Sequence, residues 1–148
     1  MLLPCSQSHR LPCALIVDLD QTLALIGNRD PYNASSCEQD TLNHTVAELL
    51  EGYQSVNPGL RTLIITSRPH TFQQPTERFL EAHGIRYDAL FMREPDDWRP
   101  CELYKRSVFQ THIAGQYHVH AAFDDNGEVC RMWMEMGVPV YWVGHPEN

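Results

Sequence analysis

The chain has 148 residues, and 11 basic side chains against 19 acidic ones give it a formal net charge of −8. This length fits one domain, and a hydrophobic content of 43% excludes a wholly disordered chain. No apolar run approaches the roughly 20 residues that span a bilayer, and the acidic balance argues against non-specific coating of DNA.

The first residues contain neither the basic segment nor the long apolar segment of a signal peptide. Five cysteines, none of them in a CxxC pair, are expected to be reduced thiols. We therefore expect a cytoplasmic protein with no membrane partner, built as an N-terminal tail over residues 1–12 and one domain over residues 13–148.

Apolar runs bounded by turn residues predict five buried strands, at residues 13–17, 62–66, 89–92, 119–123 and 138–143. Between them, helical patterns run over 41–53, from Pro75 to just before Gly84, over 99–114 and over 128–136. The first of these helices is expected to bury one face, made of Val46, Leu49, Leu50 and Tyr53. The segment 27–39 has no periodicity and is expected to be a long loop. This alternation predicts an α/β fold with a mainly parallel sheet, whose ligand lies at the carboxyl ends of the strands.

Two carboxylates, Asp18 and Asp20, follow the first predicted strand in the segment DLDQT. Such neighbours repel each other unless a cation lies between them, and Mg²⁺ prefers oxygen ligands of this kind. A bare pair is also compatible with a solvated acidic turn. A second pair, Asp124 and Asp125, follows another predicted strand at the same edge of the sheet. Two uncompensated pairs on one edge would be unfavourable, so together they predict a metal site.

Polar residues also follow the second predicted strand, where Thr66, Ser67 and Arg68 begin a loop. A hydroxyl group beside free backbone N–H groups can hold a phosphoryl oxygen, although an ordinary turn would have the same sequence. Lys105 is the only lysine of the chain and lies in the third predicted helix. A lone helix lysine usually faces solvent, but from this position its ammonium could reach the same edge and offset the charge of a phosphate.

In this order, DxDxT, a strand-end threonine, a helix lysine and a DD pair resemble the haloacid dehalogenase superfamily of phosphotransferases. The resemblance implies a three-layer, Rossmann-like fold with a central five-stranded sheet. It also implies that Asp18 is a nucleophile that forms an aspartyl-phosphate, and that Asp20 is the general acid and then the general base. Thr66 and Lys105 would bind the transferring phosphoryl group. The implied Mg²⁺ ligands are Asp18, the backbone carbonyl of Asp20, Asp124 and, nearby or through water, Asp125.

A narrower resemblance extends outside these motifs, to the segments 28–32 (NRDPY), 91–94 (FMRE), 97–99 (DWR) and 102–105 (ELYK). They are similar to the 3′-phosphatase domain of the bacteriophage polynucleotide kinase-phosphatase. That family removes 3′-phosphates and 2′,3′-cyclic phosphates from nucleic-acid ends. The resemblance implies a substrate site, with arginines that suit bidentate contacts to phosphate; its residues would be Arg29, Ser67, Arg68, Asp97 and Arg99. The three tryptophans are expected to be core or rim aromatics, and Trp98, between Asp97 and Arg99, is the one best placed to stack on a base.

The sequence departs from this family at two positions, Gln21 in place of the glycine of DxDGT and Asn126 in place of an arginine after the DD pair. No GxxxxGK[ST] segment occurs, so the 5′-kinase or ligase step would need a separate chain. Only 45 residues separate Asp20 from Thr66, which leaves no room for a large cap domain. An uncapped site suits the end of a polymer, either DNA or RNA.

Three further interpretations stay open at this point. A phosphatase for a small nucleotide or sugar phosphate is favoured mildly by the net charge of −8. A non-catalytic module that binds phosphorylated ends would follow if Gln21 has abolished turnover. A receiver-type signalling domain is disfavoured, because its phosphorylated aspartate lies on a middle strand and Asp18 follows the first.

Overall fold

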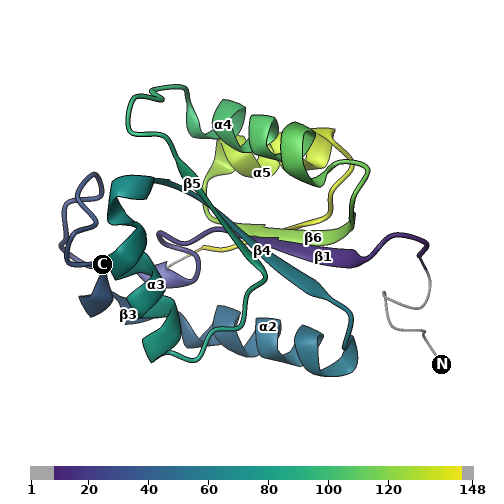
Figure 1. The fold of residues 1–148 in the computed structure, drawn as a ribbon, viewed down its shortest axis with the longest axis horizontal. Helices are drawn as coiled ribbons and strands as arrows, with labels where there is room; N and C mark the ends of the chain where they lie inside the picture. The colour runs from purple at the N-terminus through teal and green to yellow at the C-terminus, as the bar shows by residue number, and fades with distance from the viewer. Residues whose placement is uncertain (1–8, 145–148) are drawn as a thin grey trace.

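The computed structural model describes residues 9–144 and contains a five-stranded sheet in the order β5-β4-β1-β6-β7 (Figure 1). All four neighbouring strand pairs are parallel. The strands are β1 (Cys13–Val17), β4 (Arg61–Pro69), β5 (Ala89–Arg93), β6 (His118–Asp124) and β7 (Val140–Trp142). Each of the five predicted strands is present, and the predicted α/β fold with a parallel sheet is confirmed.

Helices cover both faces of this sheet. The helices α2 (His44–Val56) and α3 (Gln73–Ala82) lie on one side, and α4 (Cys101–Val108) and α5 (Gly127–Glu135) lie on the other (Figure 1). A π-helical turn, Phe109–Ile113, continues α4. The third predicted helix therefore covers the right region, but Pro100 delays its start to Cys101.

The central strand β1 shows why the sheet forms. All five of its residues are buried, as expected for a parallel strand covered on both faces. Cys13, Leu15 and Val17 pack into the core beneath α2 and α3, whereas Ala14 and Ile16 pack into the core beneath α4 and α5. Because side chains alternate along a strand, one short apolar run joins two hydrophobic cores. This strand fixes the position of the residues that follow it.

The first helix differs from its prediction at one end and on one face. It starts at His44, because the preceding Thr41–Leu42 segment forms strand β3, which pairs with β2 (Ala24–Leu25) in a separate two-stranded ribbon. Val46 and Leu50 are buried as expected, but Leu49 is 45% exposed. The predicted loop over 27–39 contains only a short 3₁₀ turn, Cys37–Gln39. No cap domain is inserted within residues 9–144.

The remaining expectations from composition are partly met. Cys37, Cys101 and Cys130 are free thiols, as expected, but Cys13 is disulfide-bonded, so the expectation is wrong at that position. None of the described helices has the length and apolar character needed to cross a membrane. Most of the predicted N-terminal tail, together with Cys5, lies outside the described residues. Of its described part, the carbonyl oxygen of Pro12 accepts a hydrogen bond from the backbone N–H of His118.

Candidate active site

The functional side chains gather where three parallel strands end. Asp18 follows β1, Thr66 lies in β4, and Asp124 ends β6. The backbone N–H of Asp18 donates to the carbonyl oxygen of Phe123 at 3.0 Å, which sets the ends of β1 and β6 side by side. Carboxyl ends of neighbouring parallel strands lie at one edge of a sheet, where α/β proteins bind ligands.

Three carboxylates meet at this edge. Asp18, Asp124 and Asp125 each offer an oxygen atom, and these atoms lie within 4.8 Å of one another. Among the described residues, this is the group of side chains whose spacing suits a metal ion. Oxygen donors in this number fit a hard divalent cation such as Mg²⁺.

Lys105 reaches these carboxylates from helix α4, which covers one face of the sheet. Its ammonium donates to Asp18 Oδ1 at 2.9 Å and to Asp124 Oδ2 at 2.6 Å. The lysine is buried, so the structure answers the ambiguity of the sequence: this helix lysine does not face solvent. Its position allows it to offset negative charge that accumulates beside Asp18.

The charge balance of this group is visible in its pKa shifts. Burial by itself would lower the pKa of Lys105, but Asp18 and Asp124 outweigh burial and raise it. Burial and the nearby Asp18 raise the pKa of Asp124 to about 6 and that of Asp125 to about 8. One ammonium therefore does not compensate three carboxylates. A further positive charge, from protons or a metal ion, is needed to keep them together.

The loop between the two aspartates of DLDQT is held in an unusual conformation. Gln21 has a φ of 63°, in the left-handed region that favours glycine, which explains why the related motif has glycine here. The backbone N–H of Gln21 donates to the carbonyl oxygen of Ala24 at 2.7 Å, and its side chain accepts from the N–H of Ile26 at 3.2 Å. Thr22 Oγ1 can donate to Asp18 Oδ2 at 3.1 Å. The departure at Gln21 therefore leaves the loop closed around Asp18.

Asp20 points away from the three carboxylates and towards two arginines. Its Oδ1 accepts from Arg68 Nε at 3.1 Å, from Arg68 Nη2 at 2.6 Å and from Arg29 Nη2 at 3.2 Å. Among the residues 9–144, every hydrogen bond to this carboxylate falls on Oδ1. The other oxygen, Oδ2, is therefore available to carry a proton.

A buried aspartate that the sequence analysis missed, Asp40, completes this network. Its carboxylate accepts from Arg29 Nε at 2.9 Å, from Arg29 Nη2 at 3.0 Å and from Arg68 Nη2 at 3.2 Å. Only 3% of its side chain is exposed. Both guanidinium groups are thus held by Asp20 and Asp40, an arrangement that favours positioning of Asp20. The expected contact of these arginines with substrate stays a prediction.

Two other groups at this edge are buried without a hydrogen-bond partner among the described residues. They are the hydroxyl of Ser67 and two guanidinium nitrogens of Arg93, Nε and Nη2. Both residues line the same cavity as Asp18. Buried donors without acceptors are costly, so a ligand with acceptor oxygens would satisfy them. Arg93 was part of a sequence motif here, but no pattern marked it as a site residue.

The predicted substrate residues Asp97 and Arg99 form an ion pair in the loop between β5 and α4. Asp97 accepts from the Nε of Arg99 at 3.0 Å and from its Nη2 at 2.7 Å. These hydrogen bonds lower the pKa of Asp97 to about 2. The pair is therefore fully charged at neutral pH and shapes the rim of the site.

A cavity of about 450 Å³ connects these parts, and it contains most of the residues predicted from sequence. Asp18, Asp20, Thr66, Ser67, Arg68, Asp97, Lys105, Asp124 and Asp125 line it. Arg29 and Arg99 do not. Arg29 reaches the site only through Asp20 and Asp40. The structure thus brings nine of the eleven predicted residues together around one opening.

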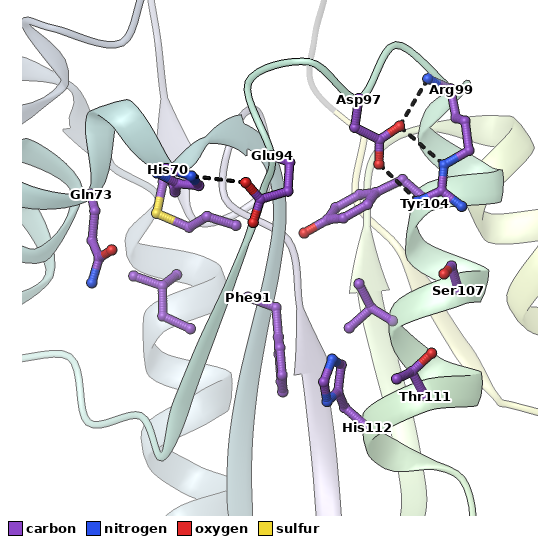
Figure 2. A pocket seen from close by; sticks show the side chains of 13 residues that line it. His70, Gln73, Phe91, Glu94, Asp97, Arg99, Tyr104, Ser107, Thr111 and His112 are labelled. Atoms are coloured by element: carbon purple, nitrogen blue, oxygen red, sulfur yellow. Dashed lines mark hydrogen bonds and ion pairs between the residues drawn. The ribbon is translucent and has the colours of Figure 1, made fainter.

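A second cavity, of about 540 Å³, lies beside the edge strand β5 (Figure 2). Its acidic side chains already have partners, since Glu94 contacts His70 and Asp97 pairs with Arg99. None of the three clustered carboxylates lines it. We therefore take the cavity that contains Asp18 as the candidate active site.

A parallel sheet of this order, with carboxylates, a threonine and a lysine at its carboxyl edge, defines a haloacid dehalogenase-type phosphatase domain. The family model of the polynucleotide kinase PNKP phosphatase domain matches residues 12–147. The chain belongs to this family. In the solved structure of a Pnkp1/Rnl/Hen1 complex, one chain matches with a TM-score of 0.88 and 38% identity, over 95% of this chain and 49% of that one.

Two further similarities agree with this assignment. A protein of Autographa californica nuclear polyhedrosis virus, provisionally named a bifunctional polynucleotide kinase/RNA ligase, is 32% identical over 132 residues. That match covers 88% of this chain and 19% of the viral protein, so the chain spans about a fifth of that relative's length. The haloacid dehalogenase domain of the Legionella pneumophila effector Lem4 has the same fold, with a TM-score of 0.55 and 15% identity over 94% of this chain and 88% of that one.

Proposed function

We propose that this chain is a Mg²⁺-dependent polynucleotide 3′-phosphatase that acts through an aspartyl-phosphate on Asp18. The observation that carries the proposal is the pair of contacts from Lys105 to Asp18 and Asp124. They hold the Asp18 carboxylate in place in the lining of a cavity that also contains buried donors without acceptors among the described residues. Membership of the polynucleotide kinase phosphatase family supports the choice of substrate.

The reaction needs two steps. An oxygen of Asp18 attacks phosphorus, the bond from phosphorus to the 3′ oxygen breaks, and Asp20 gives a proton to the departing 3′ oxygen, which leaves as a hydroxyl group. In the second step Asp20 takes a proton from a water molecule, and the water oxygen attacks phosphorus. The bond from phosphorus to the Asp18 oxygen breaks, which releases inorganic phosphate and restores the Asp18 carboxylate. The two arginines hold Asp20 by Oδ1, which leaves Oδ2 for this proton. Thr66, Lys105 and the free donors of Ser67 would contact the phosphoryl oxygens.

The residues present fit a divalent ion. Asp18, Asp124 and Asp125, with the backbone carbonyl of Asp20, would hold Mg²⁺, and their number and oxygen chemistry suit it. When bound, the ion would supply positive charge beside the phosphate and reduce its repulsion from Asp18. The raised pKa values of Asp124 and Asp125 support this assignment, because they mark carboxylates that lack compensation.

The alternative functions considered from the sequence differ in the substrate or ligand that they require. A phosphatase for a small nucleotide or sugar phosphate is still favoured by the net charge of −8. The open cavity and the family favour a nucleic-acid end. A non-catalytic binding module is disfavoured, because the loop of Gln21 keeps Thr22 in contact with Asp18. The 2′,3′-cyclic phosphates of RNA are proposed as further substrates.

We also propose that this domain works in nucleic-acid repair together with a 5′-kinase or ligase. Two relatives support this: the viral protein, whose name combines kinase and ligase, and the Pnkp1/Rnl/Hen1 complex. Both relatives have chains much longer than this one. A cytoplasmic location stays a prediction.

The test is release of phosphate from matched oligonucleotides that carry either a 3′- or a 5′-phosphate, in Mg²⁺ and in EDTA. We expect metal-dependent release from the 3′ end only. Release from small esters but from neither oligonucleotide would instead support a phosphatase for metabolites. Oligonucleotide binding without release would support the non-catalytic module.

A further inference from the structure

Two aromatic side chains at the rim of the catalytic cavity are almost fully exposed. Tyr32 is 88% exposed and Trp98 is 87% exposed. Among the large apolar side chains of residues 9–144, the next most exposed is Val56 at 63%. Tyr32 and Trp98 come from different loops, yet both line the cavity that contains Asp18. Large aromatic surface left in water beside an active site indicates a binding surface.

The loop of Tyr32 is fixed rather than loose. The backbone N–H of Tyr32 donates to Asp30 Oδ1 at 2.9 Å. Arg29 Nη1 donates to the carbonyl oxygens of Asp30 at 3.2 Å and of Asn33 at 3.0 Å, on either side of the tyrosine. The same arginine holds Asp20 and Asp40, so the loop is tied to the catalytic network.

The loop of Trp98 is fixed in a similar way. Arg93 Nη1 donates to the carbonyl oxygens of Asp97 at 3.1 Å and of Arg99 at 2.7 Å, the residues on either side of the tryptophan. The ion pair between Asp97 and Arg99 closes the same turn. Each exposed ring is therefore presented by a loop that an arginine holds from inside.

We infer that Tyr32 and Trp98 form a stacking surface for the nucleobase of the 3′-terminal nucleotide. This inference rests on the proposed function, since it places the phosphate on Asp18 and the attached nucleoside at the rim. Every base has a flat π-face, so such a surface accepts any sequence. It selects nucleotides against phosphate esters that have no base. Fixed loops reduce the ordering cost of this contact.

The direct test compares two 3′-phosphorylated oligonucleotides that differ only in whether the terminal nucleotide carries a base. Trp98→Ala and Tyr32→Ala should each lower kcat/KM on the base-bearing substrate by about fivefold to a hundredfold, the range of one base–aromatic contact. The loss on the abasic substrate should be much smaller. Trp98→Phe retains a π-face and should recover most of the rate.

The matched control is Met134→Ala, because Met134 is 51% exposed on α5 and does not line the cavity. It should leave the ratio of the two rates unchanged. Equal losses on both substrates, or no loss from either aromatic variant, would overturn the inference. If neither aromatic variant loses activity, the exposed rings of Tyr32 and Trp98 would instead be available to a different partner, such as a protein.

A binding measurement separates failure of the inference from failure of the proposed function. In the Asp18→Asn background, an oligonucleotide with a base at its 3′-phosphorylated end should quench tryptophan fluorescence, and the abasic one should not. The quenching should disappear in Trp98→Phe, which retains Trp133 and Trp142. Phosphate release that does not depend on the terminal base, together with no quenching, would contradict only the stacking surface. Quenching without any phosphate release by the parent protein would contradict only the proposed phosphatase activity.

Discussion

Lys105 Nζ lies 2.9 Å from Asp18 Oδ1, and it joins a helix on one face of the sheet to the end of the central strand 87 residues earlier. The same ammonium lies 2.6 Å from Asp124 Oδ2. One cation is thus shared between two buried carboxylates. Most of the properties proposed for the site depend on this shared charge.

Removal of this charge should affect both activity and stability. Lys105→Met should reduce phosphate release by at least about a hundredfold, the effect of one lost electrostatic contact to the reacting group. It should also lower the free energy of unfolding, because Asp18 and Asp124 would then face each other without compensation. The loss of stability should be larger at pH 8 than at pH 5, where protons can replace the ammonium. An equal difference in denaturant midpoint between parent and variant at both pH values would contradict this.

The stability of the metal-free protein should fall as the pH rises. The pKa of Asp125 is raised to about 8 and that of Asp124 to about 6, so the folded protein binds more protons than the unfolded chain above the ordinary value of 3.8. The free energy of unfolding therefore decreases between about pH 4 and pH 8. Mg²⁺ should reverse this decrease, because it replaces the protons.

Denaturant titrations from pH 5 to pH 8 can measure this effect, with Asp125→Asn as the control. His118 has the opposite effect on the pH dependence of stability. Burial lowers its pKa, so its contribution makes the free energy of unfolding rise with pH. The difference between parent and variant cancels its contribution. If both proteins lose stability equally with pH, then Asp125 is not the source.

Asp40 should affect both the rate of phosphate release and the stability, although it does not line the cavity. Asp40→Asn would leave two buried guanidinium groups, those of Arg29 and Arg68, with one carboxylate between them. We expect a loss of about tenfold to a hundredfold in phosphate release, because Asp20 would be held less accurately. Stability should fall by about 3 kcal/mol or more, since the ion pairs are buried.

The comparison for this variant is Glu38→Gln. Glu38 pairs with Arg78 at 2.6 Å, but both side chains are about half exposed. Such surface pairs contribute at most about 1 kcal/mol, so the variant should be nearly silent in rate and in urea denaturation. An Asp40→Asn protein that resembles Glu38→Gln would show that the network does not position Asp20.

Gln21 provides a local test of backbone conformation. Gln21→Gly should be more stable than Gln21→Ala by about 1 kcal/mol, because a φ of 63° costs an alanine that amount and costs glycine almost nothing. Both variants lose the contact of the side chain with the N–H of Ile26, so this loss cancels. Urea denaturation measures the difference. A more stable alanine variant would contradict the assigned conformation.

The sequence was most informative where pattern and chemistry agree. The apolar run of β1 predicted a buried strand, and the motifs at strand ends predicted one shared edge, because parallel strands place their ends together. Loop geometry was not predictable in the same way. Asp40 follows a short 3₁₀ turn in a segment without periodicity, and only the fold brings it to Arg29 and Arg68.

The helix that starts at His44 shows a second limit of prediction from the sequence. Leu49 fits the periodicity of a buried face but is 45% exposed, since the helix packs through Val46 and Leu50 instead. Arg93 was also visible only as part of a motif. It makes two contacts to carbonyl oxygens, and two of its nitrogens have no hydrogen-bond partner among residues 9–144; no spacing in the sequence encodes either feature.

The most direct test of the central claim is a search for phosphate bound to Asp18. The protein would be mixed with a 3′-phosphorylated oligonucleotide and Mg²⁺, quenched in acid during turnover and analysed by peptide mass spectrometry. The account predicts one added phosphoryl group on the peptide that contains Asp18, absent with a 5′-phosphorylated oligonucleotide and absent in Asp18→Asn. Phosphate release that continues in Asp18→Asn, with no adduct in the parent protein, would contradict it.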